Sequence, residues 1–110
     1  MRQSHTAVIE RNVWWEGAFA TEPYEAAWAS EALFFVRTLE SRGPEGGMTA
    51  RVQISPDGMV WCDEGTRMTL PAAPGLDFCR VRHFGGWLRL CGELPPESSL
   101  RVIVYLVLKA

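Results

Sequence analysis

The sequence is poor in the side chains on which most enzymatic chemistry depends. It has two histidines, His5 and His83, and three cysteines, Cys62, Cys79 and Cys91, without a C-x-x-C spacing. A zinc site or a redox pair is therefore not expected. A Cys79–His83 nucleophile pair has no geometry that the sequence fixes. We expect no catalytic residue, no metal and no cofactor, and we interpret the cysteines as buried, reduced thiols, with one disulfide plus one free thiol as the alternative.

The chain also lacks any concentration of positive charge. Its net charge is −2, and ten arginines and the single Lys109 are spread among thirteen acidic residues. No basic run is present that could displace counterions from a phosphate backbone or bind an anionic bilayer surface. Neither a nucleic-acid partner nor a membrane partner is expected.

Long hydrophobic runs are missing as well. No apolar stretch approaches the roughly 20 residues that a membrane-spanning helix needs. The opening residues, Met1–His5, lead into a strand pattern and not into the leucine-rich segment of a signal peptide. A cytoplasmic location is the default expectation.

What the chain does contain is the balance of an ordinary globular domain. Apolar residues make up 47% of its 110 residues and charged residues 22%, which fits a single domain over residues 1–110. Turn signals divide the chain into short segments and favour an all-β fold, an antiparallel β-sandwich of jelly-roll type with about seven or eight strands. These signals are at Glu16-Gly17, Arg42–Gly47, Pro56–Gly58, Glu64-Gly65, Pro71–Gly75, Gly85-Gly86 and Leu94–Pro96.

A hairpin between Ala50 and Gly65 is the clearest local structure. Apolar and polar residues alternate over Ala50–Ile54, which is the period of a strand with one buried face. Pro56–Gly58 then supplies a turn, and Met59–Cys62 is predicted to return antiparallel. Other strands are predicted at Ala7–Trp15, Phe78–Val81, Trp87–Cys91 and Leu100–Leu108, the last being the strongest strand signal in the chain.

The stretch between Thr21 and Ser41 has two interpretations. One is a helix over about 23–41, which would make the fold α+β, because six apolar residues recur there at helical spacing: Tyr24, Trp28, Ala32, Phe35, Val36 and Leu39. The other is a loop over Pro23–Ser30 followed by a strand over Ala32–Leu39. We favour the strand, because Leu33–Val36 is rich in residues that prefer strands.

The segment Ser55-Pro56-Asp57-Gly58-Met59-Val60-Trp61 resembles the S-x-D-G-x-x-W hairpin of discoidin-like, galactose-binding-type jelly-roll sandwiches. The resemblance is confined to the Ala50–Trp61 hairpin. It implies a β-sandwich, and it implies no ligand residue, because the motif itself is structural.

The apolar pattern exceeds what one core needs. In a two-layer sandwich each strand buries one face, yet both faces of the Leu100–Leu108 and Leu33–Val36 segments are apolar. Exposed, such a surface would invite aggregation, so a loop of the same chain, a second copy or another protein must cover it. We predict a non-enzymatic structural or assembly protein, a homo-oligomer or the partner of another protein, and a subunit or decoration of a larger symmetric particle. The predicted interface residues are Ile103, Tyr105, Val107, Phe34, Val36 and Trp14.

A small carbohydrate- or ligand-binding module is the alternative. Five tryptophans are many for this length, and an exposed indole can stack on a sugar while neighbouring polar groups bind its hydroxyls. A glycan partner would then use Trp28, Trp87, Arg89 and Glu25.

Overall fold

The computed structural model describes residues 3–43 and 48–110, and these residues form strands and no helix. The predicted all-β fold is confirmed, and the predicted jelly-roll sandwich with it. The strands are β1 (Ser4–Glu16), β2 (Ala18–Ala20), β3 (Tyr24–Glu25), β4 (Glu31–Arg42), β5 (Thr49–Ser55), β6 (Cys62–Thr69), β7 (Gly75–Arg82), β8 (Trp87–Glu93) and β9 (Ser99–Lys109).

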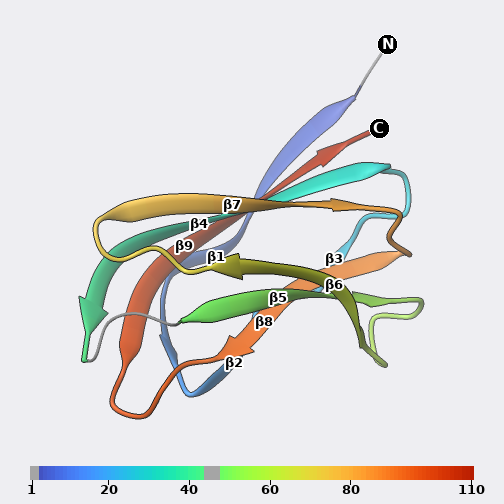
Figure 1. The fold of residues 1–110 in the computed structure, drawn as a ribbon. Coiled ribbons are helices and arrows are strands. Elements are labelled where there is room, and N and C mark those ends of the chain that lie inside the picture. The colour runs from blue at the N-terminus through green and yellow to red at the C-terminus, as the bar shows by residue number, and fades with distance from the viewer. Residues whose placement is uncertain (1–2, 44–47) are drawn as a thin grey trace.

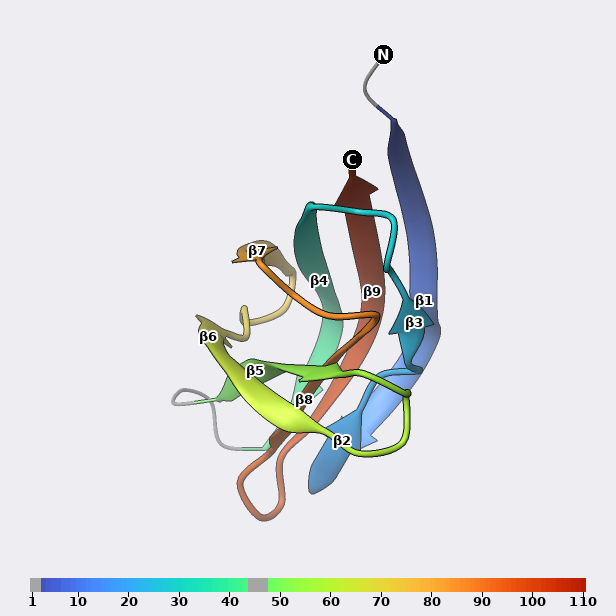
Figure 2. The same cartoon turned by 90° about the vertical axis from the view of Figure 1, so that its right-hand side faces the viewer.

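The strands form two antiparallel sheets that pack face to face (Figures 1 and 2). The first, called sheet A here, has the order β1-β9-β4-β7. The second, sheet B, has the order β2-β8-β5-β6, and β3 also pairs with β8. The chain crosses between the sheets so that β1 pairs with β9, β2 and β3 with β8, β4 with β7, and β5 with β6. This order is that of a jelly roll, with its second strand divided into β2 and β3.

The ambiguous stretch is strand and loop, so the alternative of a helix over 23–41 is wrong. β4 lies between β9 and β7, and Phe34 is opposite Leu106 on one side and Cys79 on the other. In the pairings with β7 and β9, the N–H and C=O groups of β4 form hydrogen bonds to the neighbouring strands and not to each other, as they would in a helix. The predicted loop over Pro23–Ser30 is interrupted only by the two residues of β3.

The hairpin is confirmed, but its second strand begins at Cys62 and not at Met59. Arg51 is opposite Arg67 and Gln53 is opposite Asp63, so β6 contains an irregularity at the predicted Glu64-Gly65 turn. Gly65 takes a φ of +116° there, a conformation open mainly to glycine. The predicted turn at Arg42–Gly47 lies outside the described residues from Pro44 onward.

Alternation along the two central strands of sheet A builds the core. Val102, Val104, Leu106 and Leu108 of β9 are wholly inaccessible to solvent, and each such side chain stabilises the fold by about 1.5–3 kcal/mol relative to exposure.

Two predicted interface residues belong to this core. Phe34 and Val36 are opposite Leu106 and Val104, point inward with them and are wholly buried. Their assignment to an interface is wrong, because the register with β9 places the alternate residues of β4, such as Phe35, on the outer face.

The neighbouring residues Phe34 and Phe35 allow the assignment of the inner and outer faces of β4 to be tested. Phe34→Ala leaves a cavity in the core and should lower the free energy of unfolding by about 3–5 kcal/mol. Phe35→Ala removes an outward ring whose described aromatic contact is Phe78, with ring centroids 5.5 Å apart, and should cost about 1 kcal/mol. Urea denaturation at low protein concentration checks both values. Equal losses would contradict the assigned faces.

Candidate interaction surfaces

The outer face of sheet A carries an unbroken cross-strand row of apolar side chains. Val8 of β1 is opposite Tyr105 of β9, Tyr105 is opposite Phe35 of β4, and Phe35 is opposite Phe78 of β7. Directly paired residues of an antiparallel sheet point to the same side. The four side chains therefore form a band across the whole sheet.

Further apolar side chains extend this band along the strands. Val107 and Leu33 form the next pair on one side, and Ile103, Arg37 and Leu76 form the next row on the other. Eight residues make up what we call the apolar face: Val8, Leu33, Phe35, Leu76, Phe78, Ile103, Tyr105 and Val107. All of them are partly or largely exposed, Leu76 most of all at 59%.

The outer surface of sheet A that carries the apolar face, with the charged residues among it, is comparable in area to the largest apolar patch of an ordinary monomer. Four strands at ~4.8 Å spacing, over the eight paired residues of β4 and β7 at ~3.4 Å each, cover roughly 500 Å². The largest apolar patch of a typical monomer is about 300–600 Å² and is often functional.

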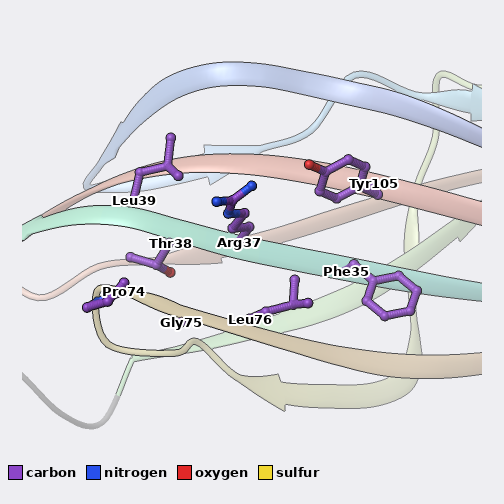
Figure 3. Close-up of a pocket in the computed structure, with 8 residues that line it drawn as sticks. All are labelled: Phe35, Arg37, Thr38, Leu39, Pro74, Gly75, Leu76 and Tyr105. Atoms are coloured by element: carbon purple, nitrogen blue, oxygen red, sulfur yellow. The ribbon is translucent and has the colours of Figure 1, made fainter.

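Arginines stand among and beside these apolar groups. The Arg80 guanidinium lies 5.1 Å from the centre of the Phe78 ring, and Arg82 forms a 3.5 Å ion pair with Glu31. Arg37 is exposed and pairs with no acid among the described residues. It lies inside a hollow of about 530 Å³, lined also by Phe35, Thr38, Leu39, Pro74, Gly75, Leu76 and Tyr105 (Figure 3).

The structure brings part of the predicted interface together. Ile103, Tyr105 and Val107 lie side by side on the apolar face. Trp14 is on the same side of sheet A, opposite Arg101 on the edge strand β1, where the Arg42 guanidinium lies 4.4 Å from its ring.

Sequence reasoning missed five residues of the apolar face. Leu33 and Phe35 belong to a segment whose two faces are both apolar, and the prediction placed Phe34 and Val36 outside instead of them. Leu76, Phe78 and Val8 were not predicted, because the apolar and charged residues around them do not show which face of the strand lies outside.

The outer face of sheet B has the opposite character, with polar groups bound to one another. Asp63 Oδ1 accepts hydrogen bonds from Arg51 Nε at 3.2 Å and from Gln53 Nε2 at 2.9 Å. Gln53 Oε1 accepts one from Arg89 Nε at 2.8 Å, and the Arg89 guanidinium lies 4.4 Å from the Trp61 ring centre. The bond from Gln53, and then that from Arg51, lowers the pKa of Asp63. The result is a hydrogen-bonded polar surface around one indole.

This face also gathers most of the predicted ligand residues. Glu25 is opposite Trp87, and Arg89 is two residues further along β8 on the same side. Trp28 lies apart, in the connection from β3 to β4, and is 46% exposed. The prediction missed Trp61, Gln53 and Asp63, which lie close together only because β5 is placed between β6 and β8.

The turn between β5 and β6 is held by two of its own side chains. Ser55 Oγ accepts hydrogen bonds from the backbone N–H groups of Asp57 and Gly58, and the Ser55 hydroxyl donates to Asp57 Oδ1 at 3.0 Å. Asp57 Oδ1 also accepts from the N–H groups of Met59 and Val60, at 2.9 and 3.0 Å. These bonds take donors that a strand over Met59–Val60 would have needed, which is why β6 starts later than predicted.

Two further constraints give the S-x-D-G-x-x-W segment a structural role. Gly58 has a φ of +80°, and a Cβ at that position would lie 3.1 Å from the Trp87 ring. The backbone of the turn is therefore held by several contacts, yet it presents Met59 and Val60 to solvent at 79% and 71% exposure. No other large apolar side chain among the described residues is as exposed.

The cysteines do not form a reactive site in the described structure. Burial raises the pKa of Cys79 to about 11 and also raises the pKa of Cys91, so both thiols remain protonated at neutral pH. Cys62 is exposed, so the prediction that all three are buried is wrong. Within residues 3–43 and 48–110, no group of three or more histidine, cysteine or acidic side chains could hold a metal ion.

Jelly-roll sandwiches are a recurrent architecture with many functions. No family model matches this chain, and no curated protein matches it. Among solved structures it is similar to the PBSX exported protein XepA, with a TM-score of 0.61 and 14% identity. It is also similar to the structure of the infectious bursal disease virus Gx strain, with a TM-score of 0.48 and 11% identity.

The chain spans about a third of each of these proteins. The alignment covers 94% of this chain and 36% of XepA, and 98% of this chain and 32% of the viral chain. At 14% identity, the similarity to XepA shows a shared fold and nothing beyond it. The described residues also contain no helix of the length and hydropathy that crossing a bilayer requires.

Asp57 should make the stability of the turn depend on pH. Backbone hydrogen bonds from Val60 and Met59, and then the bond from Ser55, lower the pKa of Asp57 below its usual 3.8. Its contribution is therefore present above pH 3.8 and is lost as the pH falls through the lower folded-state value. Asp57→Ala should lower the Tm at neutral pH, and the difference from the parent should shrink in stronger acid.

Asp57→Asn is the matched control for this prediction. It retains a side-chain oxygen that accepts the two backbone N–H groups but has no carboxyl to titrate, so it should lose less stability and show a weaker acid dependence. Thermal melts followed by circular dichroism measure all three proteins. A constant difference between Asp57→Ala and the parent down to acidic pH would contradict the assigned role.

Proposed function

We propose that this chain is a non-enzymatic structural or assembly protein that associates with further copies of itself through the apolar face. In this proposal it is a subunit or decoration of a larger symmetric particle. The observation that carries the proposal is the continuous row Val8–Tyr105–Phe35–Phe78, which crosses all four strands of sheet A and is covered by none of the described chain.

The composition of the face supports a protein partner. Protein interfaces combine an apolar, aromatic centre with a charged rim, and tyrosine and arginine are frequent at their energetically important positions. Here Tyr105 and Phe35 are central, while Arg80 and Arg82 lie along the edge strand β7. A standard interface buries about 800 Å² per partner, and the roughly 500 Å² of sheet area would form the larger part of one such interface.

The chemistry of the remaining side chains supports a non-enzymatic role. The Cys79 thiol is buried, with a pKa of about 11, and His83 lies outside on the exposed loop that follows β7. A Cys79–His83 nucleophile pair, which the sequence analysis set aside, would have its thiol protonated and inside the core, where a substrate cannot reach it.

A charge at the centre of the apolar face tests the proposal. Tyr105→Glu should leave a folded chain, because the site is on the surface, and should reduce the assembly to the 12.3 kDa monomer. Light scattering after size exclusion measures the mass, and near-UV circular dichroism confirms folding. Trp28→Glu is the matched control, since it adds the same charge at an exposed aromatic residue away from the face. Parent and Tyr105→Glu proteins of equal mass would contradict the proposal.

Recognition of a glycan is a second candidate, favoured by the outer face of sheet B. Trp61, Trp87 and Glu25 lie there beside the network of Arg89, Gln53 and Asp63. An indole with neighbouring hydrogen-bonding groups is a surface on which a sugar ring can stack.

Calorimetric titration with neutral oligosaccharides tests this candidate. It predicts heat of binding for the parent and for Trp14→Ala, whose indole is on the other sheet, and loss of that heat in Trp61→Ala. Absence of binding to the parent would reject the glycan candidate and leave the assembly proposal unaffected.

A further inference from the structure

We infer that assembly is head to tail: the turn Asp57–Val60 of one copy docks into the hollow on the apolar face of the next. This inference rests on the proposed function, and it names which surface of the second copy meets the apolar face. The turn projects, the hollow is open, the two carry opposite charges, and they lie at opposite ends of the sandwich.

The turn has the properties of a projecting anchor. Met59 and Val60 are the two most exposed large apolar side chains of the described residues, at 79% and 71%. They are presented by a backbone that Ser55 and Asp57 hold through four N–H hydrogen bonds. A turn that is already ordered loses little conformational entropy when it binds, which favours affinity.

The hollow has the complementary properties. Its volume is about 530 Å³, and Phe35, Leu39, Leu76 and Tyr105 provide apolar walls around the guanidinium of Arg37 (Figure 3). Methionine is flexible and fills irregular apolar spaces well. A Met59 side chain from another copy is therefore a suitable occupant.

The charges also match. The hydrogen bonds that Asp57 accepts within the turn all end on Oδ1 and leave Oδ2 out of that network. Arg37 has no acidic partner among the described residues. Docking of Met59 and Val60 would bring a carboxylate toward this arginine, and a charge-assisted hydrogen bond is stronger than a neutral one.

The two surfaces lie at opposite ends of the molecule. Ser55, just before the turn, is opposite Trp87, at the end of the sandwich where β7 finishes and β8 begins. Pro74 and Leu76, in contrast, lie where β7 starts, at the other end in Figure 1. One copy therefore cannot fill its own hollow with its own turn. Two different surfaces in contact form a heterologous interface, which produces a ring or a filament and not a two-fold dimer.

Two variants test this arrangement, one on each surface. The turn variant carries Met59→Ser and Val60→Ser, and the hollow variant carries Leu76→Asp. All three positions are more than half exposed, so both variants should fold. Each alone should associate at least about 30-fold more weakly than the parent, as expected for an interface hot spot. Trp28→Ser is the control and should assemble like the parent.

Mixing the two variants is the decisive step. The turn variant retains an intact hollow and the hollow variant retains an intact turn, so an equimolar mixture should form one heterodimer, with two chains of 12.3 kDa and no larger species. Analytical ultracentrifugation with one partner fluorescently labelled detects it.

The unfavourable outcomes separate the two proposals. A turn variant with the mass of the parent overturns the head-to-tail inference, as does a mixture that remains monomeric. Assembly through the apolar face still stands in both cases if Tyr105→Glu is monomeric. A parent that is itself monomeric overturns both proposals.

Discussion

The placement of β9 between β1 and β4 is the constraint on which the rest of the molecule depends. Hydrogen bonds on both sides fix the register of this strand, and the period of two then assigns every side chain to one face. Val102, Val104, Leu106 and Leu108 are thereby committed to the core. Their neighbours Ile103, Tyr105 and Val107 are committed to the outside by the same bonds, although they too are apolar. A shift by one residue would exchange two apolar sets, so the geometry of the sheet and not hydrophobicity alone decides which set is buried.

The outer faces of the two sheets differ in polarity. Sheet B covers its outside with groups that satisfy one another, from Arg51 through Asp63 and Gln53 to Arg89 stacked on Trp61. Sheet A presents aromatic and aliphatic side chains, with Arg37 among them and Arg80 and Arg82 on the edge strand β7. Water is a good solvent for the first surface and a poor one for the second. This difference between the outer faces of the two sheets supports association through sheet A. The exposed turn at the far end of the sandwich supports an association that is head to tail.

Local patterns were sufficient to predict most of the fold, and long-range pairing explains the rest. The alternation in Ala50–Ile54 and the β-branched residues near the C-terminus predicted β5 and β9 without further information. β2 and β3 have three and two residues, too few to show a period. All four residues of Leu33–Val36 are apolar, so the sequence does not show which of them face the core. Only the pairing with β9 places Phe34 inside and Phe35 outside. The cluster around Trp61 is invisible along the chain because three separate strands contribute to it.

Hydroxyl-radical footprinting of the unmodified chain over a dilution series tests most directly whether another copy covers the apolar face. If another copy covers this face, Phe35, Phe78 and Tyr105 will be protected at high protein concentration and become labelled on dilution, while Trp28 will be labelled throughout. Equal labelling of Phe35, Phe78 and Tyr105 at every concentration would show that no second copy covers the face.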